Sequence, residues 1–401
     1  MNVLRARCCI AGGGPAGMML GYLLARAGVD TVVLEKHGDF LRDFRGDTVH
    51  PSTLEVMHEL GLLEEFLQRP HQKVYELGGQ IGGETAMIAD FRHLPVRCGF
   101  VAFMPQWEFL DFLAQHGAKL PAFRLRMRAE ATALIEDSGR VLGVRGDAAD
   151  GPFEVHAELT IAADGRHSVL RERAGLQVDE FGAPMDVLWM KLSKRADDPA
   201  AVLGRINAGR VFVTLDRGDY WQCAYVIPKG GYDQVRAAGL AALREGIGAV
   251  APLLADRAGE LREWDDVKLL SVQINRLRRW HRPGLLCIGD AAHAMSPMGG
   301  VGINLAVQDA VAAANVLVPR SRAGAWTDDE LAAVQRRRGL PTRLTQTMQL
   351  FLQERVIGRV LAGGGTPRLA WPVRLLQRFP KLRRIPARLV GMGFRPEHVR
   401  H

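Results

Sequence analysis

The 401-residue sequence is poor in cysteine, with only Cys8, Cys9, Cys98, Cys223 and Cys287. Their number is odd and no two are spaced as CxxC, which excludes a disulfide framework and a zinc site of the usual spacing. Cys8, Cys9 and Cys287 lie inside apolar, strand-like stretches. The pattern therefore predicts free thiols in a reducing compartment, no bound metal and a cytoplasmic protein.

The sequence also lacks an apolar run long enough to span a bilayer, and it reaches its first predicted strand without an apolar leader. We therefore expect neither a transmembrane helix nor a signal peptide. With 47% apolar and 24% charged residues, the composition is typical of a soluble globular protein. One core rarely grows past about 250–300 residues, so the length predicts two cores.

The body of the chain has no excess of charge. Residues 366–401 contain nine basic residues and one acid, and this segment carries the whole formal net charge of +8. The remaining residues are balanced, with 43 basic and 43 acidic side chains. This distribution argues against a nucleic-acid partner and leaves the tail as the one segment suited to an anionic partner.

The N-terminus contains a strand–turn–helix–strand pattern. A buried strand at 8–11 precedes Gly12–Gly17, which reads GxGxxG and opens a helix to about Ala27. A second strand at 32–34 ends in Glu35. Glycines in such a turn allow a tight bend, the approach of a pyrophosphate and close helix–strand packing, and the acid can bind a ribose. The predicted dinucleotide-binding residues are Gly12, Gly14, Pro15, Ala16, Gly17, Glu35 and Lys36.

A second glycine-rich stretch, Gly289–Asn304, follows an apolar strand at 284–288 and precedes a helix. Asp290 at the strand end can accept hydrogen bonds from a polyol, and the helix start offers free N–H groups and a positive dipole end. This combination suits a flavin, which carries a ribityl chain and a ring that becomes anionic on reduction. His293 in this stretch is best explained as a structural histidine bonded to backbone.

The pattern between these motifs predicts an α/β fold with a second, sheet-based domain. We assign 1–72, 99–178 and 265–345 to the first domain, 73–98 and 179–264 to the second, and 346–401 to a helical, basic C-terminal segment. The family resemblance described next implies that the first is a doubly wound, Rossmann-like FAD-binding domain and the second an inserted α+β substrate domain on a mainly antiparallel sheet. The candidate substrate-pocket residues on the inserted strands are Met185, Trp189, Phe212 and Trp221.

Three elements in one order carry a family resemblance: GxGxxG with Glu35, then Asp164-Gly165, then Gly289-Asp290 with its glycine loop. Over about residues 8–310 they resemble the class A FAD-dependent monooxygenases, the p-hydroxybenzoate hydroxylase-like flavoprotein aromatic hydroxylases. The resemblance implies noncovalent FAD, NADPH or NADH as transient reductant, and O2. It implies hydroxylation of a largely apolar aromatic or quinone-like molecule through a flavin C4a-hydroperoxide.

The resemblance also implies roles for individual residues. Arg45 and Gln106 are expected at the phosphate and ribityl region, and Asp164-Gly165 at both FAD and the nicotinamide. Pro297, Gly299 and Gly300 are expected around the flavin ring and the peroxide, without an assigned acid or base. The remaining predicted cofactor-binding residues are Gly289, Asp290, Val301, Gly302, Ile303 and Asn304. Many relatives have glutamine before the last loop glycine, where this chain reads Gly300-Val301-Gly302.

Three other activities remain alternatives. A flavin-dependent halogenase shares the scaffold, but the stretch matching its WxWxIP motif reads Cys223–Pro228 and lacks both tryptophans. A flavin reductase or dehydrogenase of the prenyl-reductase kind would consume NADPH without O2. A FAD-bound protein that only binds a small molecule would consume neither NADPH nor O2.

The basic tail has two interpretations. In one, it forms an amphipathic surface for weak contact with anionic lipid. In the other, which the prolines favour, Trp371, Phe379, Leu382 and Phe394 pack onto the FAD domain. The sequence leaves a monomer or a homodimer open.

Overall fold

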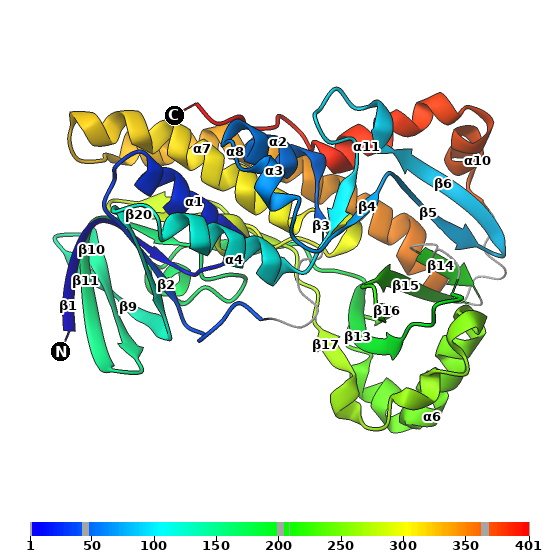
Figure 1. Ribbon diagram of the computed structural model, residues 1–401. Coiled ribbons are helices and arrows are strands. Elements are labelled where there is room, and N and C mark those ends of the chain that lie inside the picture. The colour runs from blue at the N-terminus through cyan, green and yellow to red at the C-terminus, as the bar shows by residue number, and fades with distance from the viewer. Residues whose placement is uncertain (1, 42–47, 199–203, 208, 362–368, 401) are drawn as a thin grey trace.

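The computed structural model describes residues 2–41, 48–198, 204–207, 209–361 and 369–400. Its architecture is two sheets side by side, with helices along one edge of the whole molecule (Figure 1). The predicted fold class is confirmed: a doubly wound α/β domain, a second domain on a mainly antiparallel sheet, and a helical C-terminal segment.

The first sheet is the core of the dinucleotide-binding domain. Its main path runs β19-β20-β11-β1-β2-β8, and β9 and β10 extend from β11 as an antiparallel ribbon. The four pairs from β20 to β8 are parallel, which places their carboxyl ends at one edge. Its strands are β1 (Asn2–Ala11), β2 (Thr31–Glu35), β8 (Phe123–Met127), β9 (Ala129–Asp137), β10 (Arg140–Ala148), β11 (Gly151–Ala162), β19 (His281–Arg282) and β20 (Leu285–Cys287).

Helices pack on this sheet because their inward faces are apolar. Buried Met18, Leu20 and Leu24 of α1 belong to the same core cluster as the strand residues Ile10 and Val33. Helices α1 and α7 contact each other, as do α1 and α4 and also α7 and α8. Their bounds are α1 (Pro15–Arg26), α4 (Gln106–Gly117), α7 (Gly302–Ala323) and α8 (Asp328–Leu352). Smaller helices are α2 (Pro51–Glu59), α3 (Leu63–Phe66) and α5 (Val169–Arg173).

The second sheet joins strands from both predicted inserted segments with β17, which lies just beyond the predicted limit at 264/265, in the order β17-β13-β16-β15-β14-β5-β6. Helix α6 (Tyr232–Val250) covers one of its faces and forms a separate core with it. The strands are β5 (Glu76–Ile81), β6 (Glu84–Asp90), β13 (Met185–Ser193), β14 (Gly204–Asn207), β15 (Arg210–Asp216), β16 (Tyr220–Pro228) and β17 (Lys268–Leu270).

Two small sheets bridge the domains. Strands β3 (Thr48–Val49), β7 (Val101–Phe103) and β4 (Gln72–Val74) form one, and β12 (Val178–Glu180) pairs with β18 (Asn275–Leu277) in the other. The domain limits given above remain a prediction. Helix α8 runs across the predicted limit at 345/346 and includes Pro341 without ending there.

One segment, Met298–Ala323, is long and apolar enough by composition to cross a membrane, contrary to our expectation that the sequence contains no such run. It comprises α7 and the turn before it, and 89% of its most apolar window is buried inside the protein. Burial on this scale is that of a central core helix, here packed against α1 and α8.

The C-terminal segment is docked, but not in the way that we expected. Helices α10 (Trp371–Arg378) and α11 (Arg384–Gly391) lie against β6 of the substrate domain, and the short helix α9 (Arg359–Leu361) continues from α8 through a π-helical turn. Buried Ala387 and Met392 pack with Phe91. Trp371 and Phe379 are exposed, so the expectation that they pack onto the FAD domain was wrong.

Candidate active site

A cavity of about 860 Å³ lies where the carboxyl edge of the first sheet meets the open face of the second. Its walls come from the turn after β1, the ends of β2 and β11, the start of α4 and the loop after β20. A further wall is the face of β13, β15 and β16 that α6 does not cover, and residues of β5, β7 and β9 also line the cavity. This volume is at the upper end of the range for ligand pockets. A single space therefore joins the predicted cofactor and substrate residues.

Glycine is needed at three positions of the first turn, for a different structural reason at each. Gly12 has φ +109°, and a Cβ there would lie 2.2 Å from the carbonyl oxygen of Ala163. A Cβ on Gly17 would lie 1.9 Å from the carbonyl oxygen of Gly12, so this residue lets α1 approach β1. A Cβ on Gly14 would meet no atom within 4 Å and would project into open space at the cavity wall. Gly14 is thus the glycine whose small size serves a ligand and not the protein's own packing.

Glu35 ends β2 and is buried at the cavity wall. Its Oε2 accepts a hydrogen bond from the Gly13 N–H (3.1 Å) and its Oε1 from the His37 N–H (3.0 Å). These two backbone donors fix the carboxylate at the cavity wall, and a carboxylate in such a position is the kind of acceptor that binds ribose hydroxyls. Lys36 also lines the cavity, with Nζ 3.5 Å from Glu130 at the surface. Pro15 and Ala16 begin α1 at the same wall.

Asp290 lies where β20 ends, facing the cavity, with Oδ2 3.5 Å from Arg166.

Gly289 does not line the cavity. Its N–H donates to Oδ2 of Asp309 (3.0 Å), and that carboxylate also contacts His293 Nε2 (2.6 Å) and Arg338 Nε (3.0 Å). His293 is therefore structural, as predicted, but its partner is a buried carboxylate and not backbone. Arg338 on α8 was absent from our candidates because it lies far away in sequence.

The loop before α7 turns at Gly299 (φ +80°) and Gly300 (φ +63°), where a side chain would be strained. The residues Pro297, Gly299, Gly300, Gly302 and Ile303 line the cavity, so the start of α7 directs its positive dipole end toward the cavity. Two predicted residues face elsewhere. Val301 packs with Met295 and Leu305, and Asn304 Oδ1 accepts a hydrogen bond from Thr53 Oγ1 (2.5 Å).

Asp164 and Gln106 both line the cavity. Asp164 also accepts hydrogen bonds from Ser168 Oγ (2.5 Å) and Leu170 N–H (3.2 Å), and therefore fixes the start of α5. Burial raises the pKa of Asp164 despite these bonds. Gly165, with φ +88°, turns the chain at the same wall. Arg45 lies outside the described residues.

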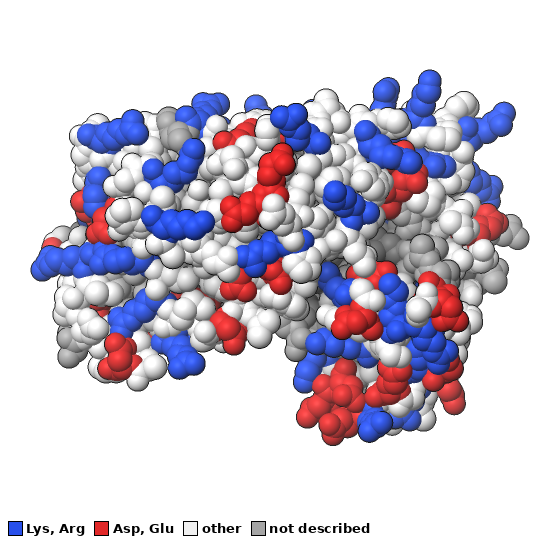
Figure 2. All heavy atoms as spheres, in the orientation of Figure 1, with Lys and Arg blue, Asp and Glu red and all other residues white. Residues whose placement is uncertain are grey.

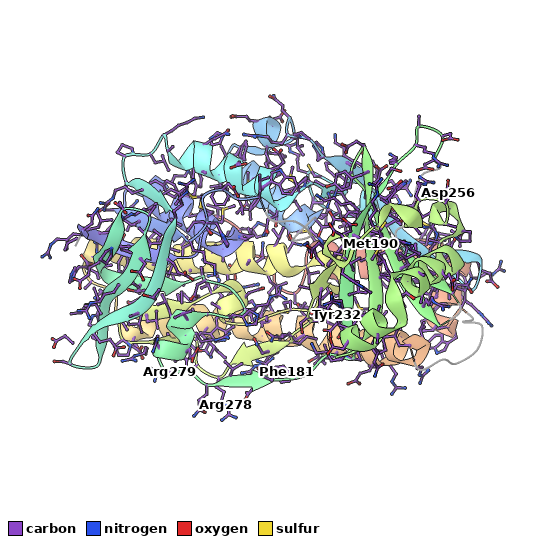
Figure 3. The ribbon with its side chains drawn as sticks, turned by 90° about the horizontal axis from the view of Figure 1, so that it is seen from below. Phe181, Met190, Tyr232, Asp256, Arg278 and Arg279 are labelled. Carbon is purple, nitrogen blue, oxygen red and sulfur yellow. The ribbon has the colours of Figure 1, made fainter. Side chains whose placement is uncertain are left out.

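The inserted sheet contributes an apolar wall, and here two predictions were wrong. Met185 and Trp189 line the cavity, whereas Phe212 and Trp221 are buried on the opposite face beneath α6. Side chains alternate along a strand, so neighbouring residues take opposite faces. Figure 3 labels Met190, which follows Trp189 and lies with Phe212 on the α6 side. The same wall also contains six residues that our sequence analysis did not identify as pocket residues: Val187, Val211, Val213, Leu215, Ala224 and Val226.

His50 is a cavity residue that our sequence reasoning missed. It is buried between β3 and α2, and its Nδ1 lies 2.9 Å from the carbonyl oxygen of Val390, so Nδ1 carries a proton and donates. Burial lowers the pKa of His50 from 6.5 to about 4, although the hydrogen bond to Val390 opposes this shift. The imidazole is therefore neutral at pH 7.

This burial predicts a pH dependence of stability. Between pH 6.5 and 4 the unfolded chain binds a proton at His50 that the folded chain does not, so the free energy of unfolding falls as pH falls. A shift from 6.5 to about 4 corresponds to about 3 kcal/mol. Urea unfolding at pH 7 and pH 4 should show that wild type loses about this much more than His50→Asn, whose amide can keep the bond to Val390. Equal losses in both proteins would contradict the assignment.

Comparison with known proteins gives concordant results. The family described as "FAD binding domain" matches residues 5–346. The 6-methylpretetramide 4-monooxygenase of Streptomyces rimosus is 34% identical over 359 residues, which cover 88% of this chain and 85% of that protein. A rifampicin monooxygenase of Rhodococcus hoagii is 28% identical, and the match covers 75% of this chain and 61% of that protein. The solved anhydrotetracycline hydroxylase OxyS of Streptomyces rimosus has the same fold, with a TM-score of 0.77 at 24% identity, covering 97% of this chain and 76% of that one.

Proposed function

Because this chain belongs to the FAD-dependent aromatic hydroxylase family and is a monooxygenase, we propose that its substrate is a neutral, fused-ring aromatic compound. The observation that carries this proposal is the wall formed by β13, β15 and β16 opposite the loop before α7. Every described side chain that these three strands contribute to the cavity is apolar or aromatic. Such a wall favours a flat, poorly charged molecule over a small acid.

The names of the relatives support a large ring system. The 34%-identical relative is named for 6-methylpretetramide and the next for rifampicin. The cavity must hold both FAD and the substrate, and its 860 Å³ extends from Glu35 to Leu270 along the sheet wall. We infer that the substrate lies flat against Trp189 and Val213 with its reacting ring toward Pro297 and Gly299.

The described residues fit FAD. Gly14 leaves open space for the pyrophosphate, Glu35 presents a fixed carboxylate to the ribose, and Asp290 faces the ribityl position. Bound FAD supplies electron transfer from NAD(P)H and the activation of O2. The protein's own contribution is to hold the two rings together, exclude water with the apolar wall, and stabilise negative charge with the N-terminus of α7. We propose that it does so in the cytoplasm, where its five free, buried thiols would remain reduced.

The reaction is tested with labelled O2. Aromatic compounds are screened for those that accelerate NADPH oxidation by the yellow holoenzyme, and the product is analysed by mass spectrometry. Balance requires that substrate, NADPH, a proton and O2 give hydroxylated product, NADP+ and water, with one labelled oxygen atom in the product. NADPH oxidation without O2 uptake would instead identify a reductase. If compounds bind tightly but none accelerates NADPH oxidation, the chain would be identified as a binding protein. Added bromide should give no brominated product.

Two tryptophans on opposite sheet faces should respond differently to truncation. Trp189→Ala removes part of the cavity wall and should raise KM about tenfold or more, because a large apolar contact contributes about 1.5–3 kcal/mol. Trp221 is buried under α6, and its Nε1 donates to Asp198 Oδ2 (2.8 Å). Trp221→Ala should therefore cost about 3–5 kcal/mol of stability while leaving KM nearly unchanged. Kinetics and urea unfolding of both variants measure this contrast, and similar KM changes would contradict it.

A further inference from the structure

The outward surface of the C-terminal segment combines large apolar and basic side chains. We call it the tail face and define it by the exposed residues Trp371, Arg374, Leu375, Arg378, Phe379, Lys381, Arg384, Ile385 and Arg388. We propose that the tail face binds the surface of an anionic lipid bilayer. This interaction goes beyond the oxygenation reaction and does not depend on it.

Helix α10 presents its apolar and basic residues on one side. Trp371, Arg374, Leu375 and Arg378 have the spacing i, i+3, i+4 and i+7, which places them along one helical stripe. The helix cannot simply rotate to bury this stripe, because Gln377 is hydrogen-bonded to both the N–H (3.2 Å) and the carbonyl oxygen (2.7 Å) of Met87 in β6. Trp371 consequently remains 75% exposed and Leu375 40% exposed.

Helix α11 continues the same arrangement and is anchored more deeply. Ala387 is buried beside Phe91, and Val390 packs against the cluster of Met295, Val301 and Leu305. The carbonyl oxygen of Val390 accepts the hydrogen bond from His50. With its inner side fixed in this way, α11 leaves Ile385 55% exposed. The tail face is therefore carried by a folded platform that adjoins the active-site loop.

The charge of the tail face has one sign. No acidic residue occurs from position 355 to position 396. Figure 2 shows Lys and Arg spheres projecting outward over the region where Figure 1 places α10 and α11. Arg383, which is not part of the tail face, points inward and lies 3.9 Å from Glu76. The basic side chains of the tail face, in contrast, point outward and are placed to bind an external anion.

An anionic bilayer fits both components of this surface. Trp371, Phe379 and Ile385 can enter the boundary between headgroups and acyl chains while neighbouring cations contact lipid phosphates. A second copy of the chain fits poorly, because a two-fold contact would place Arg374 and Arg378 against like charges. A nucleic acid would neutralise the arginines but leave Leu375 and Ile385 against a polar backbone.

The test is co-sedimentation of the intact holoenzyme with vesicles of phosphatidylcholine, alone or mixed with phosphatidylglycerol. The charge variant is Arg374→Glu/Arg378→Glu and the apolar variant is Trp371→Ala/Phe379→Ala. The matched control is Lys119→Glu/Arg322→Glu, which changes the net charge equally at exposed positions outside the tail. Flavin content and melting temperature verify that each variant is folded.

We expect binding to the mixed vesicles that weakens on raising salt from about 0.05 to about 0.5 M. Each tail variant should lower the partition constant about tenfold or more, and the control should lower it by less than about threefold. The proposal is overturned if the holoenzyme does not sediment with anionic vesicles, or if the tail and control variants bind alike. It is also overturned if sedimentation velocity shows a dimer that only the tail variants lose. None of these outcomes changes the expected FAD content or labelled-oxygen result, so failure here is distinguishable from failure of the proposed reaction.

Discussion

Gly14→Val should abolish FAD binding while leaving the protein folded. A valine at this position projects its branched side chain into the open space of the cavity, where no protein atom lies within 4 Å of a Cβ. The protein itself loses nothing, but the pyrophosphate can no longer approach the backbone at the start of α1. Purified Gly14→Val should be colourless, with flavin per chain falling from about one to near zero.

Its neighbours could not serve as the same test. Gly12 and Gly17 would each bring a Cβ within about 2.2 Å of a carbonyl oxygen, so substitution there damages the fold and loses FAD for an uninformative reason. The control is Gly259→Val, an exposed site in the substrate domain where a Cβ also meets nothing within 4 Å. It should keep its flavin. Absorbance and the FAD-induced rise in melting temperature give independent readings, and retention of yellow colour by Gly14→Val would place the dinucleotide elsewhere.

The features that the sequence predicted well are those encoded over short distances. The turn from Gly12 to Gly17 and the acid at Glu35 lie within one strand–helix–strand unit, whose geometry is nearly fixed once the glycines are in place. The loop from Gly289 to Gly302 is equally local. Both were predicted to bind a flavin from residue type and spacing, and residues of both stretches line the same cavity. The fold class followed from their order along the chain.

The sheet face on which each side chain of the inserted strands lies could not be predicted in the same way. Trp189 and Met190 are neighbours on β13 and both are apolar, yet one lines the cavity and the other lies beneath α6. Both faces of this sheet are covered, so the strand shows no alternation of polar and apolar residues. Which set of alternating side chains lines the cavity depends on where α6 docks, and the sequence of the strand does not contain that information.

Long-range polar contacts were also beyond sequence reasoning. His50 bonds to Val390 across 340 positions, and its only local signal is a histidine before the proline that starts α2.

The C-terminal segment shows that composition alone does not predict which apolar residues are buried. Its large apolar residues suggested burial, but the docking of Gln377 and Ala387 turns Trp371 and Phe379 outward.

Asp309→Ala should cause the largest loss of stability among single substitutions near the flavin loop. Its carboxylate is fully buried and contacts His293, Arg338 and the N–H of Gly289. Burial alone raises the pKa of Asp309, but the electrostatic interactions and hydrogen bonds with His293 and Arg338 outweigh it, so the pKa lies below its usual value. The carboxylate is therefore charged in the folded protein and central to a buried network.

Removing that charge leaves the buried Arg338 with a hydrogen bond from Nη1 to the carbonyl oxygen of Arg395 (3.4 Å) and with the more distant carboxylate of Glu397, 3.9 Å from the same nitrogen. Breaking a buried ion pair on one side typically costs about 3–5 kcal/mol. The same change releases the Gly289 N–H, so the loop that places Asp290 at the cavity wall becomes less well fixed. We expect urea unfolding of the FAD-free protein to show a loss of about 3 kcal/mol or more, and FAD affinity to fall about tenfold through the loop alone.

The comparison that decides this prediction is Asp30→Ala. Asp30 also pairs with an arginine, Arg124, at 2.8 Å, but both side chains are exposed. Solvent screens such a pair, and its loss should change stability by less than about 1 kcal/mol without affecting FAD. A similar small cost for Asp309→Ala would show that the buried network does not hold the loop. A large stability loss with unchanged FAD affinity would show that it supports the core of α7 and α8 but not the position of Asp290.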